Sequence, residues 1–513
     1  MYRKRFIAVG SVLGAAGVAY VTSSDVRESI VGIERFGRAA FTVARIAWDY
    51  NRTLYSKTYD VTTQEYKDIR SGAHQRSADR LLQLCLANGG VFVKVGQHVG
   101  ALDYILPPEY VKTMKVLHNK VPPINFDDIL EVVRQDLGKE PSEVFAEIDQ
   151  TPLGTASLAQ VHKAKLKCGE TVALKVQHPL VKAHAQVDIR TMEFLVRTVA
   201  WVFPDFQFLW LAEETRKNLP RELDFRIEAE NSERIAKQFA HFAWFSVPKV
   251  HWDYTTSRVL TMNYCGGSHI DDVQYMDEEK IDKRQVAARV SQLYSEMIFV
   301  HGYVHCDPHP GNVKVEKTDK GFKIHLLDHG LYTQLNSDFR ELYSQLWLSI
   351  IRADVQAIQK VSVALGVGEL YGLFACMLTA RSWTAIQQGI DKEQFTSEEQ
   401  EEIKMNAAQY LVQVADVLNR VPREMLLVFK TNDLLRSLDN ILGNSDRMTS
   451  FITMTKCCLR AQYMKKAELC TNWLCRLSAR MQYSVAQCGI FFYQVYLWGL
   501  HCKRVLCPTW MHL

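Results

Sequence analysis

Two short stretches decide the fold that this sequence predicts: HCDPHPGN at residues 305–312 and LLDHG at residues 326–330. The first gathers acid, amide and imidazole groups around two prolines and a glycine, in a rigid loop that follows an apolar helix. The second places an acid at the end of a short apolar strand. Phosphoryl transfer needs one carboxylate to orient the nucleophile, and an amide oxygen and a second carboxylate to hold Mg²⁺ against phosphates. The spacing therefore predicts a catalytic Asp307 and magnesium ligands at Asn312 and Asp328.

A lysine in a separate apolar strand joins this set. Residues 171–176 read TVALKV, and a cation in such a strand is costly unless it meets an acid or a phosphate. Alone, the pattern favours an edge-strand lysine that reaches solvent. An alternative makes the histidines and the acid of residues 305–309 ligands of a transition metal, but it gives Lys175 and residues 312 and 328 no function. The combination favours a kinase-type site in which Lys175 is a catalytic, phosphate-binding lysine.

The loop ahead of the lysine strand differs from an ordinary nucleotide loop. Protein kinases place G-x-G-x-x-G there, whereas residues 152–161 read PLGTASLAQV, with alanines in place of the other glycines. Because alanine disfavours positive φ and adds a methyl group, we expect a stiffer loop. We expect Gly154, Thr155, Ala156 and Ser157 to meet nucleotide phosphates through their N–H and hydroxyl groups.

Composition and element order bound the fold class. The chain has 513 residues, 47% of them hydrophobic and 23% charged, which excludes a disordered or fibrous protein and predicts two or three packing units. The pattern is helical to about residue 118, strand-like at 157–164, 171–177 and 258–264, and helical between them at about 187–239. After residue 267 it is mainly helical, with short β-rich segments near 313–327. This order indicates an α+β fold. A net charge of +4, from 61 basic and 57 acidic residues, argues against a nucleic-acid partner.

The twelve cysteines are expected to be free thiols. Five are spread singly between Cys85 and Cys376, and seven lie between Cys457 and Cys507, without a C-x-x-C pair. This spacing favours buried, reduced thiols over a disulfide framework or a zinc site.

Both ends of the chain carry apolar segments beside basic residues. Residues 3–5 are basic, residues 6–21 are apolar, and no acid occurs before Asp25, which fits a mitochondrial sequence better than a secretory signal. Residues 485–500 are apolar and aromatic, with basic neighbours. Two interpretations of this tail stay open, a buried core helix and an interfacial helix on an anionic membrane.

Four features occur together in the sequence: KVGQ at 94–97, the alanine-rich loop at 154–159, ELD at 222–224 followed by EAEN at 228–231, and the HCDPHPGN and DHG stretches. In this combination the chain resembles the UbiB/AarF family of atypical kinases, over about residues 80–440. The resemblance implies a two-lobed protein-kinase-like fold with an N-terminal helical extension and a helical C-terminal tail. Its expected parts are a targeting or anchor segment at 1–29, the extension at 30–120, an N-lobe at 121–265, a C-lobe at 266–440 and the tail at 441–513.

The resemblance also implies roles for single residues. Lys175 would bind nucleotide phosphates and pair with Glu228, and the backbone from Met262 to Tyr264 would hydrogen-bond adenine.

In this family the helical extension folds over the active site. The resemblance implies that it carries Lys94 and Gln97 to Glu222 and Asp224, as a regulatory group. An ordinary buried ion pair is the alternative.

Departures from protein kinases bear on the implied activity. Cys306 replaces the arginine that grips an activation-loop phosphate, His309 stands where a lysine usually meets the γ-phosphate, and no Ala-Pro-Glu follows Gly330. The implied function is Mg-ATP binding with ATPase or kinase activity, linked to lipid, membrane or cristae homeostasis at the mitochondrial inner membrane. Membrane lipid and mitochondrial proteins are the implied partners. The alternatives are a serine/threonine protein kinase, a catalytically weak nucleotide-gated scaffold and a small-molecule or lipid phosphotransferase.

Overall fold

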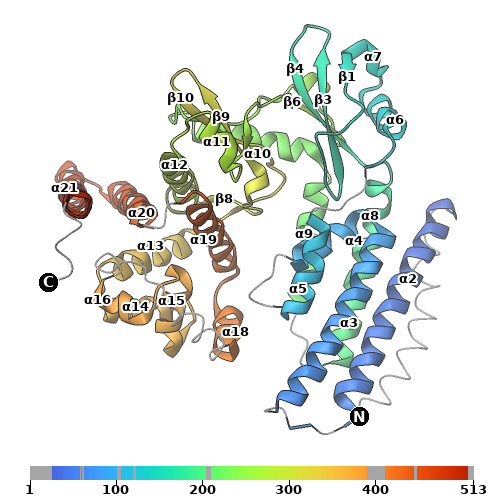
Figure 1. Ribbon diagram of the computed structural model, residues 1–513, viewed down its shortest axis with the longest axis horizontal. Coiled ribbons are helices and arrows are strands. Elements are labelled where there is room, and N and C mark those ends of the chain that lie inside the picture. Colours follow the sequence, from blue (N-terminus) through green and yellow to red (C-terminus); the bar gives the residue numbers. More distant parts are fainter. Residues whose placement is uncertain are drawn as a thin grey trace. The chain divides into compact units, whose positions relative to one another are not determined.

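The computed structural model describes residues 26–57, 59–60, 63–100, 106–118, 123–203, 209–389, 411–443 and 448–506. Their contacts divide the chain into two compact units (Figure 1). Unit 1 contains the described residues up to Lys237, together with Val247–Cys265 and Asp328–Leu331. Unit 2 contains the rest. Helices and mainly antiparallel sheets occur in both units, so the predicted α+β class is confirmed.

An antiparallel sheet in the order β1-β3-β4-β6 forms the centre of unit 1, with the short β2 also paired to β3. The strands are β1 Phe145–Ile148, β2 Gly154–Thr155, β3 Ala159–Leu166, β4 Thr171–Gln177 and β6 Val259–Asn263. Because β4 lies between β3 and β6, the interpretation of Lys175 as an edge-strand lysine is wrong. Side chains alternate along β4, so Val172, Leu174 and Val176 pack in the core with helix α6 (Phe126–Leu137), and Lys175 lies on the opposite face.

Helices make up the rest of unit 1. They are α2 Val26–Tyr50, α3 Gln64–Asn88, α4 Gly90–Gly100, α5 Pro108–Met114, α6 Phe126–Leu137, α7 Pro141–Val144, α8 Val181–Val202, α9 Leu209–Glu222 and α10 Phe225–Gln238, with short helical turns η1 Asn51–Tyr55, η2 Lys115–His118 and η3 Trp252–Tyr254. Helices α2 and α3 lie side by side, α4 and α5 pack on α3, and α8 packs on α2 and α4 (Figure 1). The predicted helical extension thus folds as a bundle.

Charge pairing and a close approach hold this bundle together. Asp49 on α2 binds Arg76 and Arg80 on α3 at 2.8 and 2.5 Å. The hydrogen bond from Arg76, helped by Arg80, holds the pKa of Asp49 well below its usual range, although burial opposes the shift. Packing requires a glycine at position 96 of the KVGQ motif, because a Cβ there would overlap with the Leu117 side chain.

Unit 2 contains two small sheets and a large helical region. One sheet has the order β5-β10-β9-β7, and β8 pairs with β11 in the other. The strands are β5 Phe245–Ser246, β7 Ser268–His269, β8 Tyr303–His305, β9 Val313–Thr318, β10 Gly321–Leu326 and β11 Tyr332–Gln334. The helices are α11 Val273–Glu278, α12 Lys283–Ser295, α13 Ser337–Ile351, α14 Val355–Ala364, α15 Tyr371–Thr379, α16 Trp383–Gln388, α18 Leu411–Arg420, α19 Arg423–Ile441, α20 Met448–Leu469 and α21 Trp473–Leu506, with the turns η4 Glu296–His301, η5 Pro310–Asn312 and η6 Gly368–Leu370. Helix α20 packs on α12 and α13, and α21 packs on α20.

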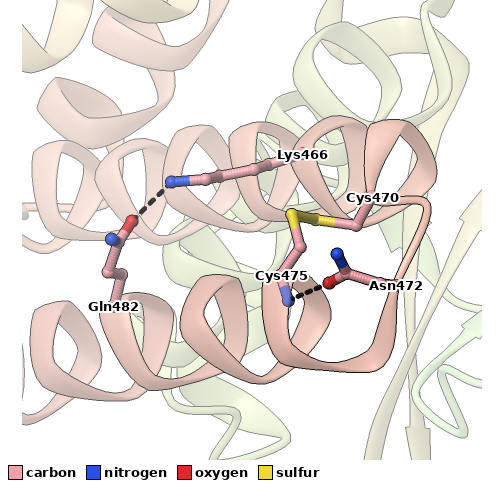
Figure 2. The surroundings of a disulfide bond; sticks show 5 residues. All are labelled: Lys466, Cys470, Asn472, Cys475 and Gln482. Carbon is pink, nitrogen blue, oxygen red and sulfur yellow. Dashed lines mark hydrogen bonds between the residues drawn. A yellow bond between two sulfur atoms is a disulfide. The ribbon is translucent and has the colours of Figure 1, made fainter.

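A disulfide joins the last two helices. Cys470 and Cys475 are bonded across the short turn between α20 and α21 (Figure 2). The expectation of free thiols throughout is therefore wrong for this pair, because the turn brings the two side chains within bonding reach. Cys85, Cys168, Cys457, Cys458 and Cys488 are free thiols. Burial raises the pKa of Cys85 and of Cys457 to about 12, so these two thiols pack as small apolar groups.

The apolar tail is a helix with an exposed side. Val485, Phe491 and Phe492 of α21 are all more than half exposed. The interpretation of residues 485–500 as a buried core helix is therefore wrong for these positions, because only the opposite side of α21 faces α20. Among the described residues, no helix is long and apolar enough to cross a membrane. The apolar segment at residues 6–21 lies outside the described residues.

Candidate active site

The first group of predicted residues lies in unit 1, and we call Lys175, Glu228 and Asp328 the lysine cluster. The Lys175 ammonium on β4 donates to both carboxylate oxygens of Glu228, at 2.7 and 2.8 Å. It also lies 3.7 Å from Asp328 Oδ1 and 5.3 Å from the ring centre of Phe225. Glu228 belongs to the first turn of α10, so a strand and a helix bring the lysine and its buried partner together.

Burial and charge act against each other in the lysine cluster. Burial raises the pKa of Glu228 to about 7, although the Lys175 ammonium opposes this shift. Burial also lowers the pKa of Lys175, but the Asp328 and Glu228 carboxylates outweigh it and the net shift is upward. Lys175 therefore stays cationic, as a lysine that binds phosphate must.

Hydrogen bonds hold the segment that carries Asp328. Asn231 of α10 donates from its amide to the His329 carbonyl at 2.9 Å, and His329 is buried. The Gly330 N–H donates to Asp328 Oδ1 at 2.9 Å. The Asp328 side chain is 42% exposed, so a fixed backbone presents a carboxylate that a metal ion can reach.

The alanine-rich loop is a tight, braced turn. The Ala156 N–H donates to the Ala159 carbonyl at 2.8 Å, and the Ala156 carbonyl accepts from His178 Nε2 at 3.0 Å. The Ala156 N–H is thus bonded within the loop, so the expectation that it donates to a nucleotide phosphate is wrong for this group. Ser157 is buried, whereas Thr155 is partly exposed, so Thr155 offers the more accessible hydroxyl to a phosphate.

Gly154 lies at the open side of this loop. It is exposed, its φ is not in the left-handed region, and a Cβ there would meet nothing within 4 Å. Neither backbone conformation nor packing within the described chain requires glycine at this position.

The expected adenine contact has to be corrected in one respect. Met262 lies in the β4–β6 ladder opposite Ala173. The Asn263 N–H donates to the Lys249 carbonyl at 2.9 Å, and the Tyr264 N–H donates to the Thr171 carbonyl at 3.2 Å. Both N–H groups are therefore already bonded within the chain, and the expectation that they donate to adenine is wrong. Contact between residues 262–264 and adenine through their other atoms stays a prediction.

The group around the KVGQ motif is brought together in part. Lys94 on α4 binds buried Glu222 on α9 at 2.8 Å, and the Gln97 amide donates to the Leu117 carbonyl at 3.0 Å. Asp224 was expected to meet Lys94 and Gln97, but its carboxylate binds Arg226 at 2.7 Å. The reason is local, because Asp224 Oδ1 also accepts from the Arg226 N–H at the start of α10.

Lys94 also acts on the lysine cluster. Its charge opposes the rise in the pKa of Lys175, so the extension brings a second cation close enough to influence the first. The other carboxylate oxygen of Glu222, Oε1, is buried without a hydrogen-bond partner in the described part of the chain.

The second group of predicted residues, Asp307 and Asn312, lies in unit 2. Together with Lys430, which the sequence did not predict, we call them the loop cluster. Lys430 on α19 binds Asp307 Oδ1 at 2.8 Å. The Asn312 amide nitrogen donates to the Asp307 carbonyl at 3.2 Å, and the Asn312 carbonyl accepts from the Leu327 N–H at 2.9 Å. The side-chain oxygen of Asn312 is the atom that a magnesium ion would use.

The histidines of residues 305–309 do not form the alternative metal site. His305 Nδ1 accepts from the Asp307 N–H and His309 Nδ1 accepts from the Gly311 N–H, both at 3.1 Å. Among the described residues, no group of three His, Cys, Asp or Glu side chains could hold a metal ion. The imidazoles instead brace the loop that carries Asp307.

Comparison with known proteins identifies the family of the chain. Residues 116–362 match the ABC1 atypical kinase-like domain. A Drosophila melanogaster protein named AarF domain-containing kinase 1 is 49% identical over 460 residues, 89% of each chain. The chain belongs to the ABC1/AarF family of atypical kinases. A Gallus gallus member, AarF domain-containing protein kinase 1, is 45% identical over 498 residues, 96% of each chain.

A solved structure is also similar to this ABC1/AarF chain. It is the complex of Rv3197 with erythromycin from Mycobacterium tuberculosis, 18% identical, with a TM-score of 0.47, covering 73% of this chain and 97% of that one. Membership of the family, with the antiparallel sheet and the α10 helix in place, confirms the protein-kinase-like fold.

Sequence reasoning missed three residues of the candidate site. Lys430 lies 123 positions after Asp307, and no motif marked it. His178 braces the alanine-rich loop, and Asn231 holds the His329 carbonyl. Only Asn231 had a signal in the sequence, because it closes the EAEN stretch.

Proposed function

We propose that this ABC1/AarF chain binds Mg-ATP and hydrolyses it or transfers its γ-phosphate. The observation that carries the proposal is the lysine cluster, in which Lys175 is held between buried Glu228 and partly exposed Asp328. A cation beside a metal-binding carboxylate is the pair that phosphoryl transfer uses on nucleotide phosphates. Magnesium, when bound, would neutralise developing charge on the phosphate oxygens. In unit 1, Asp328 is the side chain that we assign to the metal, and the role of Asn312 stays a prediction from its motif.

The loop cluster supports the transfer step. Asp307 would orient the attacking hydroxyl or water and accept its proton. His309 stands where protein kinases usually carry a lysine, and in this chain Lys430 supplies a cation to Asp307 from α19 instead. Lys430 would contribute positive charge where negative charge develops on the phosphoryl group.

A thermal shift with nucleotide tests the binding step. The chain would be heated with Mg-ATP, with Mg-ADP, and with each nucleotide plus a chelator, beside Asp328→Ala. We expect a rise in the unfolding temperature that needs the metal and is absent from the variant. No rise in a folded wild-type sample, and none in Lys94→Ala, would contradict the nucleotide site.

A nucleotide-gated scaffold is the second candidate, and the Lys94–Glu222 pair favours it. This pair ties the extension to α9, and the Lys94 charge already acts on Lys175. If the extension closes the nucleotide site, Lys94→Ala should increase the nucleotide-dependent shift. The scaffold candidate further requires that Asp307→Asn keep both the shift and the cellular function.

We also propose a mitochondrial setting at the inner membrane, in lipid, membrane or cristae homeostasis. The support is the basic, acid-free segment before Asp25 together with the apolar tail. Fractionation of mitochondria with intact and ruptured outer membranes, followed by protease treatment, would test the location. Transfer of labelled γ-phosphate would show whether the acceptor is a protein or a lipid or other small molecule. In either case, the transfer should be lost in Asp307→Asn.

A further inference from the structure

The outer side of α21 is a mainly apolar face, with Ser484 as an exposed polar position within it. The described side chains that point away from α20 include Trp473, which is 71% exposed, and Phe492, which is 69% exposed. We define the α21 face as Trp473, Leu474, Leu477, Met481, Val485, Cys488, Phe491, Phe492 and Val495, all of them exposed. At about 100° per residue these positions fall within an arc of roughly 120°. Over this stretch the face is roughly 33 Å long, at about 1.5 Å per residue.

The opposite side of α21 is fixed to the rest of unit 2. Tyr483 stacks on Tyr463 of α20 with ring centres 4.8 Å apart, and Ala479 is buried. Gln482 accepts a hydrogen bond from Lys466 near the disulfide (Figure 2). The helix therefore has a packed side and an outward side, and a surface of this size on a protein marks a binding site.

The charges around this face point to an anionic occupant. No acidic residue occurs from Leu469 to the end of the sequence, whereas this stretch contains Arg476, Arg480, Lys503 and Arg504. Arg476 and Arg480 are exposed and lie along one edge of the α21 face. A second copy of α21 would bring no carboxylate to these arginines and would add like charges, so self-pairing is disfavoured.

We propose that the α21 face binds the surface of a bilayer that contains anionic phospholipids. Helix α21 would lie along the membrane, with its aromatic and aliphatic side chains at the acyl boundary and its arginines among the head-group phosphates. The inference goes beyond the proposed nucleotide chemistry and does not depend on it, because it concerns a different helix and needs no nucleotide.

Vesicle binding of the full chain tests the proposal. The vesicles would be phosphatidylcholine alone, or phosphatidylcholine mixed with phosphatidylglycerol in equal parts. We expect binding to the anionic vesicles that weakens as salt is added. Met481→Glu combined with Phe492→Glu should weaken it by at least about tenfold, because two apolar contacts are lost and negative charge is added. Arg476→Gln with Arg480→Gln should weaken it by about 25-fold on anionic vesicles, at roughly fivefold for each basic residue.

A matched control separates the face from general surface effects. Val363 on α14 of the same unit is also an exposed apolar residue, so Val363→Glu should leave vesicle binding unchanged. Because all the substituted side chains are exposed, the unfolding temperature of each variant should match that of the wild type.

A probe on Cys488 locates the contact on the helix itself. A polarity-sensitive fluorophore would be coupled to the wild type and to Cys488→Ser, and the difference between the two signals belongs to Cys488. We expect this difference signal to shift to the blue with anionic vesicles. Absence of the shift, equal binding to neutral vesicles, or Glu variants that bind like the wild type would overturn the proposal. Self-association that the Glu variants abolish would overturn it in favour of a second copy.

Discussion

Two lysine–carboxylate pairs in this chain have nearly the same length but different surroundings. Lys175 and Glu228 are 2.7 Å apart, with side chains only 14% and 4% exposed. Lys430 and Asp307 are 2.8 Å apart, with side chains 32% and 43% exposed. A buried pair cannot lose one partner without leaving an uncompensated charge, whereas a half-exposed pair can exchange its partner for water or ligand. The lysine cluster is therefore built into unit 1, and the loop cluster can change partners during a reaction.

The largest expected effect comes from breaking the buried pair. Lys175→Met leaves Glu228 buried without its cation, so the free energy of unfolding should fall by about 3–5 kcal/mol and the nucleotide-dependent thermal shift should disappear. The equivalent change in the half-exposed pair, Lys430→Met, should cost less than about 1 kcal/mol. Urea denaturation of both variants measures the two losses side by side.

The double variant Lys175→Met/Glu228→Gln provides the control for this experiment. It removes the unpaired charge and should regain most of the lost stability without regaining the nucleotide shift. Equal losses in the two single variants would show that burial does not distinguish the pairs.

Lys430→Met should act on turnover instead. Removal of a cation at the site of developing charge should lower kcat for ATP turnover by about 100-fold, with the nucleotide-dependent shift retained. Single-turnover kinetics with labelled ATP would measure this. A variant that turns over faster than the wild type would mean that the Lys430–Asp307 pair restrains the reaction.

The raised pKa of Glu228 predicts that the free energy of unfolding depends on pH through the buried pair. It is raised in the folded chain from its ordinary 4.5 to about 7, so the folded state holds this proton more tightly than the unfolded chain does. The stabilisation is complete below pH 4.5 and is lost as the pH rises through about 7. The stability of the wild type relative to Glu228→Gln should therefore fall across this window. A constant difference between the two chains from pH 5 to 8 would contradict the raised pKa.

The smallest expected effects are those of Gly→Ala substitutions at two positions of unit 1, which should differ clearly in their effect on stability. Gly96→Ala places a methyl group against Leu117 and should cost about 1–3 kcal/mol. Gly154→Ala meets open space and should change the free energy of unfolding by less than about 0.5 kcal/mol. Any loss of the nucleotide shift in Gly154→Ala would then report on the nucleotide contact alone. A marked loss of stability in Gly154→Ala would show that the loop needs its glycine for folding.

Periodicity and motif spacing predicted much of this structure. The β4 strand was predicted at its observed bounds, and β3 and β6 within two residues at each end, because apolar alternation there reflects burial on the sheet. Short strands such as β2, β7 and β11 were missed, since two or three residues carry no period. The exposed side of α21 could not be predicted from the sequence either. Apolar residues occur on both sides of this helix, and only the packing shows which side α20 covers.

The candidate site also contains residues that the sequence predicted and residues that it did not. Motifs marked residues that lie close together in sequence, such as Asp307 and Asn312 in one loop. They could not find Lys430, because the approach of α19 to that loop depends on tertiary packing. The expectation for Asp224 failed for a local reason instead, because its carboxylate binds its near neighbour Arg226.

The bond from Asn231 to the His329 carbonyl has a consequence for ligand discovery. An outward flip of residues 328–330 would break this bond and bring the buried His329 side chain into water. Inhibitors that select a flipped form bind with an apparent affinity reduced by the fraction of molecules that adopt it. We therefore expect compounds that bind with Asp328 in its present position to bind this chain more tightly than compounds that require the flipped form. Asn231→Ala, which removes the bond to the His329 carbonyl, should increase the affinity for compounds that require the flip.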